Sequence, residues 1–449
     1  MSRYVTYKPS GIDWIGEVPI DWKVKRVKDF FSILGGNGFP DDEQGNETGD
    51  IPFLKVSDIN SDDYRVYSSS NYVSNETVLK KGWNVIPANS IVMGKIGEAL
   101  KKNHRKINTV DCLIDNNMMA LQPLPKVNIK FSYYLLSIVD MDWFTNPGTI
   151  PAVSTVALKS SKVTLPSPSE QLTIANYLDD QTQKIDRLIA NKKAQAEKLK
   201  ELRQIEINNA VTKGLNPNAE MKDSGIEWLG KIPKHWELKK IKQLLKPEKN
   251  AIKTGPFGSD LKFEDLIEEG IKVYNQRSVL DNDWKSGEGY ISAEKYESLK
   301  TCTIFPDDIV ITTRGTIGKV SIFPADAELG ILHPCLMRIQ MNSQRILNDY
   351  LKIIINDSSF FFEALKLASN ATTIDVIYSD SLKEVKIPDP PTNEQVEITT
   401  YLQKKVSAID QLIKNIEAQI EKLQELRKIK IYEAVTGKIK VNAYAETTA

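Results

Sequence analysis

Residues 170–212 read EQLTIANYLDDQTQKIDRLIANKKAQAEKLKELRQIEINNAVT, and residues 394–436 read EQVEITTYLQKKVSAIDQLIKNIEAQIEKLQELRKIKIYEAVT. The two stretches align without a gap, and more than half of their positions are identical. Neither contains proline or glycine, whereas prolines precede both and a glycine follows each. Such bracketing is typical of uninterrupted helices. The sequence therefore predicts two long helices that are copies of one another.

A second repeat lies ahead of each predicted helix. KPSGIDWIGEVPIDW starts at Lys8 and returns as KDSGIEWLGKIPKHW at Lys222. The helix repeats are 394 − 170 = 224 residues apart and these motifs 222 − 8 = 214, so the segment between them changed length in one copy. The intervening segments match only faintly. We predict an internal pseudo-twofold duplication, in which a shared scaffold carries two different globular parts.

Each predicted helix carries one narrow apolar stripe, which it cannot bury alone. About forty residues at ~1.5 Å each form a rod of roughly 60 Å. We expect the two rods to pair as an antiparallel coiled coil; the alternative is that each helix caps its own domain. The predicted seam residues follow a seven-residue repeat and are Leu178, Ile185, Leu188, Leu199, Leu202, Leu402, Ile409, Leu412, Ile416, Leu423 and Leu426.

The globular parts show short β-rich runs separated by turn residues, with a few helical stretches. Expected strands are 51–56, 90–93, 271–274, 308–312 and 336–340, and expected helices are 131–139 and 346–355. The fold class is thus α+β or mixed: two α/β domains separated by two long helices. The predicted boundaries are 1–165 for the first domain, 166–214 for the first helix, 215–390 for the second domain, 391–440 for the second helix and 441–449 for a tail.

The composition limits the partners of this chain. Its 449 residues contain 59 basic and 59 acidic side chains, so bulk charge alone cannot hold it to nucleic acid, and local basic patches would be needed. Its three cysteines are far apart, which fits a reducing compartment. The sequence shows neither a signal core nor a long apolar run, so we expect a cytoplasmic protein that does not span a membrane.

Motifs for catalysis are absent from the sequence. DPPT at Asp389 lacks the aromatic residue that an adenine methyltransferase needs, and GTIGKV at Gly315 lacks the spacing of a phosphate-binding loop. Glu384, Lys386 and Asp389 stand in the reverse of the order expected for a metal nuclease. The three histidines are too scattered to activate a nucleophile. We therefore expect no catalytic residue and no metal site, and interpret the chain as a binding protein.

Basic and hydroxyl residues gather at matched places in the two copies. One cluster follows the expected strand at 90–93, and the other lies on the glycine-rich loop after the strand at 308–312. Such loops approach phosphates closely, and arginine can also contact a guanine edge. A lysine run at 231–249 is a further basic stretch. The candidate DNA-binding residues are Lys95, Lys101, Lys102, Arg105, Thr254, Ser259, Arg277, Thr312, Thr313, Arg314, Thr316 and Lys319.

The doubled motifs resemble a known family, the specificity (S) subunits of type I restriction–modification systems. The likeness rests on SGIDWIGEVPIDW and SGIEWLGKIPKHW, on PSPSEQLTIANYLD and PPTNEQVEITTYLQ, and on ID-x-LI, EKL-x-ELR and EAVTGKI. Together these motifs recur in order along nearly the whole chain. DIVITTRGTIGK also resembles the core of the family's recognition domains, whereas SIVMGKIGEALKK departs from it and has Ile96 where the second copy has Arg314.

The resemblance implies two target-recognition domains, each reading one half of an asymmetric, split sequence in double-stranded DNA. It implies that the helices hold methyltransferase (M) subunits, which methylate adenine with S-adenosylmethionine. A restriction (R) subunit, driven by ATP and Mg²⁺, would join that core, and this chain would hold no cofactor itself. If helix length sets the gap between half-sites, four residues added to both helices, ~6 Å, should widen it.

Two rival interpretations remain open. One is a stand-alone DNA-binding regulator or scaffold that dimerises through the coiled coil. Tight, specific DNA binding by the chain without partners would favour this interpretation. The other is a methyltransferase with degenerate motifs, which binding of S-adenosylmethionine would favour.

Overall fold

The computed structural model describes residues 2–39, 41–60, 63–146, 150–227, 229–369 and 373–442, without the side chain of Asp42. The chain divides into two compact units. Unit 1 comprises Met1–Lys192 and Ala418–Ala449, and unit 2 comprises Lys193–Glu417. Each unit therefore takes half of each long helix. Trp228, the repeat mate of Trp14, and the predicted tail from 443 onward lie outside the described residues.

Unit 1 is built on a five-stranded sheet of order β4-β11-β8-β9-β6, with a three-stranded sheet of order β10-β5-β7 beside it. Residues alternate between the two faces of a strand. Ile91 and Met93 of β8 face α3 and the long helices, whereas Val92 faces Leu54 of β5. The main elements are β1 (Tyr7–Pro9), β2 (Glu17–Pro19), β3 (Lys23–Arg26), β4 (Phe31–Gly35), β5 (Ile51–Leu54), β6 (Arg65–Val66), β7 (Tyr72–Val73), α1 (Asn75–Lys81), β8 (Ile91–Gly94), α2 (Gly97–Lys101), β9 (Arg105–Asn108), β10 (Leu113–Ile114), β11 (Met118–Pro123), α3 (Ile129–Ser137), α4 (Thr155–Ser160) and β14 (Lys162–Leu165).

Unit 2 repeats this layered plan. A four-stranded sheet of order β18-β25-β22-β23 lies beside a second one of order β20-β19-β24-β21. Ile309 and Ile311 of β22 face the cluster that contains α9 and α10, and Val310 faces Tyr274 of β19. The main elements are β15 (Met221–Asp223), β16 (Lys231–Pro233), β17 (Glu237–Lys240), α6 (Ile241–Leu244), β18 (Ile252–Thr254), β19 (Ile271–Tyr274), α7 (Gln276–Leu280), β20 (Gly289–Ile291), α8 (Ala293–Leu299), β21 (Thr303–Ile304), β22 (Ile309–Thr312), β23 (Val320–Ile322), β24 (Gly330–Leu332), β25 (Leu336–Ile339), α9 (Asn348–Asp357), α10 (Phe360–Ser369), α11 (Ser379–Glu384) and β26 (Lys386–Asp389).

The repeated motif at the start of each copy holds the end of a long helix. In unit 1, the Tyr432 hydroxyl donates to the carbonyl of Trp14 at 2.9 Å, and Lys438 Nζ donates to the carbonyl of Ile15 at 2.8 Å. In unit 2, Gly214 ends the other helix with φ +72°, and a Cβ there would lie 3.1 Å from the Trp236 ring. Both motifs therefore lock a helix terminus, which explains why the duplication preserved them.

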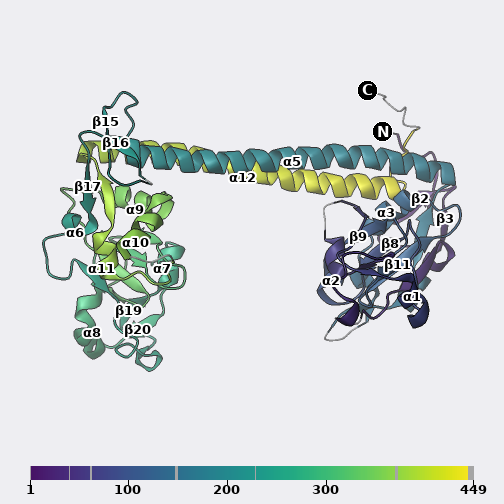
Figure 1. Ribbon diagram of the computed structural model, residues 1–449, viewed down its shortest axis with the longest axis horizontal. Coiled ribbons are helices and arrows are strands. Elements are labelled where there is room, and N and C mark those ends of the chain that lie inside the picture. The colour runs from purple at the N-terminus through teal and green to yellow at the C-terminus, as the bar shows by residue number, and fades with distance from the viewer. Residues whose placement is uncertain are drawn as a thin grey trace. The chain divides into compact units, whose positions relative to one another are not determined.

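The two long helices are α5 (Pro168–Lys213) and α12 (Thr392–Val435). Within each unit they lie side by side: Asp186 pairs with Arg427 in unit 1, and Arg203 pairs with Asp410 in unit 2 (Figure 1). Within unit 2, Arg203 pairs with Asp410 and Glu206 pairs with Lys405, so residue numbers rise along α5 as they fall along α12, and the pairing there is antiparallel. None of the described helices combines the length and the apolar character that crossing a lipid bilayer requires.

The structure corrects part of the predicted seam. Leu178, Ile185, Leu402 and Ile409 are buried, and Leu199, Ile416 and Leu423 are half-buried. The prediction was wrong for four leucines, because the second row of the seam lies four residues after the first row rather than three. Ala196, Ile413 and Ile420 occupy that row and are buried or half-buried. The displaced residues are Leu188 (50% exposed), Leu202 (40%), Leu412 (51%) and Leu426 (40%).

Candidate nucleic-acid interface

Three loops leave the same end of the large sheet in unit 2. Leu336 at the start of β25 pairs with Thr312 at the end of β22, and Met337 pairs with Thr254 at the end of β18. The loops that follow β18 and β22 and the loop that precedes β25 therefore lie next to one another. We call residues 255–260, 313–319 and 333–335 the loop edge of unit 2.

Unit 1 has an equivalent loop edge, made of residues 36–39, 95–104 and 115–117. The register places the end of β4, the end of β8 and the starts of β9 and β11 together. A glycine marks the same close approach in both units. A Cβ on Gly36 would lie 1.9 Å from the carbonyl oxygen of Asp115, and one on Gly255 would lie 2.2 Å from that of His333. Only glycine fits at either position.

The loop 313–319 is closed by its own backbone. Thr312 donates its N–H to the carbonyl of Lys319 at 2.9 Å, and its own carbonyl accepts the N–H of Gly318 at 2.8 Å. Gly315 and Gly318 have φ of +70° and +72°, a region that glycine adopts without strain. The result is a tight hairpin whose tip, Arg314 to Thr316, is exposed.

The predicted contacts of unit 2 fall into two groups. Arg314 and Lys319 are exposed and form no ion pair with any described residue, so both cations are available to a ligand. Thr312 and Thr313 are buried, and the hydroxyl of Thr313 donates to the Cys335 carbonyl at 2.9 Å. These two threonines therefore build the base of the loop rather than its surface. The remaining predicted residues Thr254, Ser259, Arg277 and Thr316 are exposed.

The predicted contacts of unit 1 are less uniform. Lys101 and Lys102 are exposed, although Lys101 pairs with Glu98 at 2.9 Å, and Lys95 is half-buried. Arg105 faces inward, because it is 5% exposed and donates from Nη1 to the Asn103 carbonyl at 2.9 Å. Burial lowers the pKa of this guanidinium to about 10. Its position indicates a structural role that sequence spacing alone did not reveal.

The lysine run at 231–249 is partly neutralised by local carboxylates. Lys234 pairs with Glu220 at 2.9 Å, and both Lys240 and Lys242 pair with Glu384, at 2.5 and 2.6 Å. Surface ion pairs of this kind reduce the local positive potential. The run therefore carries less available charge than its sequence indicates.

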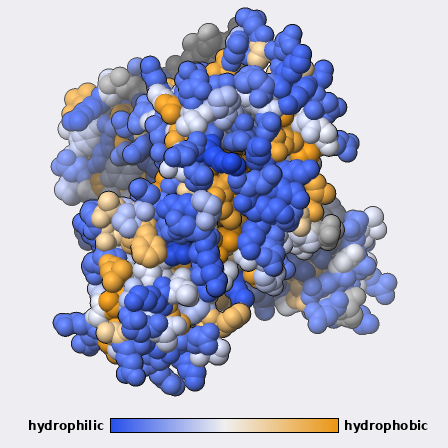
Figure 2. Space-filling model, turned by 90° about the vertical axis from the view of Figure 1, so that its left-hand side faces the viewer, coloured by the Kyte–Doolittle hydropathy of each residue, from blue (hydrophilic) through white to orange (hydrophobic). Residues whose placement is uncertain are grey.

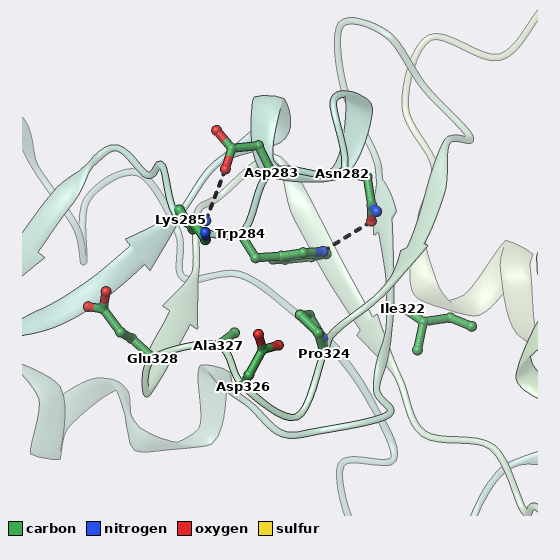
Figure 3. A pocket seen from close by; sticks show the side chains of 9 residues that line it. All are labelled: Asn282, Asp283, Trp284, Lys285, Ile322, Pro324, Asp326, Ala327 and Glu328. Atoms are coloured by element: carbon green, nitrogen blue, oxygen red, sulfur yellow. Dashed lines mark hydrogen bonds between the residues drawn. The ribbon is translucent and has the colours of Figure 1, made fainter.

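A cavity of about 320 Å³ lies away from the loop edge of unit 2, near the far end of β23. Figure 3 shows Trp284 forming one wall, with its Nε1 donating to Asn282 at 3.2 Å. The carboxylates of Asp326 and Glu328 line the opposite side. This acidic lining would repel a phosphate backbone, so the cavity is not part of the candidate interface. The described residues contain no His, Cys, Asp and Glu cluster that could hold a metal ion.

A second surface lies on the long helices, where exposed apolar residues recur at an offset of 224. In Figure 2 hydrophilic side chains cover most of the visible face, and hydrophobic ones form small separate groups. On the long helices, eight apolar residues are each 40–55% exposed, and each has an apolar mate in the other copy. We call them the outer apolar positions: Leu172, Leu188, Leu426 and Ile429 in unit 1, and Val396, Leu412, Leu202 and Ile205 in unit 2.

Two features of these surfaces are absent from the predictions made from the sequence. Leu172, Ile205, Val396 and Ile429 were detectable, because each lies outside the predicted seam yet is apolar in both copies. The four exposed leucines were not, because the same repeat assigned them to the seam. Gln276, whose side chain contacts the loop 313–319, was not detectable, because it lies 38 residues from Arg314 in the sequence. Only the packing of α7 beside β22 and β23 brings it there.

The fold and its loop edges define a class of protein: a duplicated α/β binding protein with two candidate interfaces and two long paired helices. Comparison with known proteins identifies the family. The family model for the type I restriction modification DNA specificity domain matches residues 19–198 and again residues 233–422. The chain belongs to this family and contains two copies of its domain.

Several relatives match over nearly their whole length. The chain is 25% identical over 440 residues to the type I restriction enzyme MjaVIII specificity subunit of Methanocaldococcus jannaschii, covering 94% of each. It is 23% identical over 429 residues to the EcoBI specificity subunit of Escherichia coli, covering 92% of this chain and 85% of that one.

Solved structures share the fold. A chain from a study of complex assembly and conformational transition of the type I R-M system aligns with a TM-score of 0.70 at 14% identity, covering 94% of this chain and 99% of that chain. The HsdS subunit from Thermoanaerobacter tengcongensis aligns with a TM-score of 0.53 at 15% identity, covering 94% of this chain and 98% of that one.

Proposed function

We propose that this chain is the DNA-recognition subunit of a type I restriction–modification complex. The loop edge of each unit reads one half of a bipartite, asymmetric DNA site. The observation that carries this proposal is the pairing of two family domains with two equivalent loop edges that differ in sequence. Equivalent edges with different residues suit two different half-sites.

Joining two recognition domains on one chain explains how two short half-sites can give enough selectivity. A good base contact discriminates by ~1–3 kcal/mol, so the few contacts that one loop edge can make give limited selectivity. When both readers are on one chain, the second engagement is intramolecular, and affinity and selectivity rise together. Arg314 and Lys319 are the strongest candidates for base and phosphate contact in unit 2, because both are exposed and unpaired among described residues.

The outer apolar positions support a docking role for the helices. They occur as two equivalent sets, one in each unit, which suits two copies of one partner. As part of the proposal, these partners are methyltransferase subunits, and a restriction subunit joins them. Methyltransferase subunits would supply S-adenosylmethionine chemistry, and the restriction subunit would use ATP and Mg²⁺. The zero net charge of this chain leaves much of the phosphate binding to these partners.

The chain itself is the non-catalytic component in this proposal. Its role is to position the catalytic partners on a chosen sequence, and it acts in the cytoplasm, where that DNA lies. A stand-alone DNA-binding regulator is the alternative, and it predicts tight, specific binding by the purified chain without partners.

A genome-wide adenine methylation map of the native host tests the proposal directly. The expected result is one bipartite methylated motif that disappears when the gene is deleted and returns when it is restored. A map that is unchanged by the deletion would contradict the proposal, as would specific DNA binding by the chain alone that no methyltransferase subunit alters.

A further inference from the structure

We infer that Gln276 is a positioning residue that holds the loop 313–319 of unit 2 in the conformation that reads DNA. The inference rests on the proposed function and names a residue on which the selectivity of one half-site depends. Gln276 does not itself need to touch DNA. It acts through the backbone of the loop that carries Arg314.

One side-chain nitrogen links two places on the loop. Gln276 Nε2 donates to the carbonyl of Arg314 at 3.1 Å and to the carbonyl of Thr316 at 2.9 Å. These carbonyls flank Gly315, so the amide bridges the tip of the hairpin. Gln276 Oε1 lies 3.2 Å from the place that a Cβ on Gly315 would take, which shows how closely the side chain packs against the tip.

Gln276 is itself held firmly. It is the first residue of α7, and only Asn275 separates it from the end of β19. The N-cap Asn275 fixes this junction, because its Oδ1 accepts the N–H groups of Arg277 at 3.0 Å and Ser278 at 3.4 Å. The side-chain amide of Gln276 thus connects the loop tip to the capped start of α7, the helix that follows β19 of the neighbouring sheet.

This connection matters because, among the described residues, no other hydrogen bond holds the tip from Arg314 to Thr316. Gly315 and Gly318 give the backbone more accessible conformations than other residues would. A loop that is already ordered loses less conformational freedom when it binds, and it presents the side chain of Arg314 in one direction. A loosened loop would present the same arginine to several base pairs and discriminate poorly among them.

In unit 1, backbone hydrogen bonds rather than a side chain hold the equivalent loop. The N–H of Gly97 donates to the carbonyl of Pro151 at 2.8 Å, and the N–H of Val153 donates to the carbonyl of Lys95 at 2.9 Å. These are backbone contacts, which a side-chain change at position 276 leaves intact. Loss of Gln276 should therefore affect only the half-site that unit 2 reads.

The test uses the full chain assembled with its methyltransferase subunits. Methylation rates are measured on duplexes in which each base of both half-sites is changed in turn. For Gln276→Ala we expect discrimination to fall by about tenfold at one half-site, and to stay unchanged at the other. Gln276→Glu should do the same, because a carboxylate cannot donate to the two carbonyls. The matched control is Gln344→Ala, because Gln344 is an exposed glutamine of unit 2 and its side chain makes no hydrogen bond to the described residues of the loop 313–319.

Independent variants and readouts separate positioning from simple destabilisation. Gly315→Ala disturbs the same contact from the loop side and should reproduce the one-sided loss. For the Gln276 variants, the melting temperature and the amount of bound methyltransferase subunit should match those of the wild type. Unchanged discrimination in Gln276→Ala, or equal loss at both half-sites, would overturn this inference while leaving the proposed function intact. A wild-type complex without any sequence discrimination would overturn both.

Discussion

Arg203 on α5 donates from Nε to Asp410 on α12 at 3.0 Å within unit 2. In unit 1 Arg427 on α12 makes the same bond to Asp186 on α5, also at 3.0 Å. Since 427 − 203 and 410 − 186 both equal 224, the two ion pairs are copies of each other with the helices exchanged. The two copies therefore retain the same individual contacts between α5 and α12.

These ion pairs should contribute modestly and unequally to stability. Both are part-exposed, so a double-mutant cycle on Arg427 and Asp186 should give a coupling of about 0.2–1 kcal/mol. Arg203 also pairs with Asp357 at 3.1 Å, so Arg203→Ala should lower the free energy of unfolding more than Arg427→Ala does. Urea unfolding of the single and double variants measures both quantities. Equal losses for the two arginines would contradict the contribution of Asp357.

The outer apolar positions should be needed for assembly but not for folding. Leu188→Lys combined with Leu412→Lys places one charge in each unit, at residues that are about half-exposed. We expect an unchanged melting temperature and a loss of co-purifying methyltransferase subunit, because a lysine would be buried without a partner at the interface. Leu79→Lys is the matched control, since Leu79 is 82% exposed on α1, away from the long helices. Full binding by the double variant would rule out this surface.

Arg314 and Lys319 should contribute to DNA binding in different ways. Arg314→Ala should cost about 1–3 kcal/mol on the recognised sequence and relax selectivity at one half-site, if the guanidinium contacts a base. Lys319→Ala should weaken binding to all sequences and reduce the salt slope by about 0.9, if the ammonium contacts a phosphate. Binding by the assembled complex, titrated at several salt concentrations, distinguishes the two. A similar salt slope but altered selectivity for Lys319→Ala would reverse its assignment.

Glu384 should make unit 2 sensitive to acid. Hydrogen bonds from Lys240 and Lys242 lower the pKa of Glu384 from 4.5 to about 2. Because the folded-state pKa lies below the unfolded value, its contribution to stability is present above pH 4.5 and is lost as the pH falls toward about 2. The difference in melting temperature between the wild type and Glu384→Gln should therefore shrink across that interval. A difference that stays constant down to pH 2 would show that the carboxylate gains nothing from the two lysines.

Much of the architecture could be predicted from the sequence, because periodicity and repetition report it directly. The helices are predicted at 166–214 and 391–440 and extend over Pro168–Lys213 and Thr392–Val435. The strand expected at 271–274 is confirmed as β19, and those at 308–312 and 336–340 are confirmed within one residue at each end. The seam residues were harder to predict, because the rows at spacings of three and of four both contain apolar residues. Only burial distinguishes Leu188 from Ile189.

The candidate interface was only partly predictable. Composition identifies basic and hydroxyl residues, but it does not show which of them face outward. Arg105 and Arg314 look alike in the sequence, yet one is buried against backbone carbonyls and the other is exposed at a loop tip. The role of Gln276 depends on a contact between α7 and the loop after β22. These segments are far apart in the sequence, and no local pattern encodes such a contact.

The length of the paired helices should set the spacing between the two half-sites. A seven-residue insertion keeps the seam in register, because the buried positions repeat every seven residues. Duplicating residues 188–194 in α5 and residues 412–418 in α12 would lengthen each helix by about 10 Å, which corresponds to roughly three base pairs at ~3.4 Å each. Methylation mapping should then show the same two half-sites with a gap widened by about that amount. Insertion into α5 alone is the control, and it should disrupt the antiparallel pairing and abolish methylation rather than widen the gap. If the doubly lengthened protein methylated at the original spacing, the helices would not determine the distance between half-sites, and the selectivity of the two readers would have to be set by the partner subunits instead.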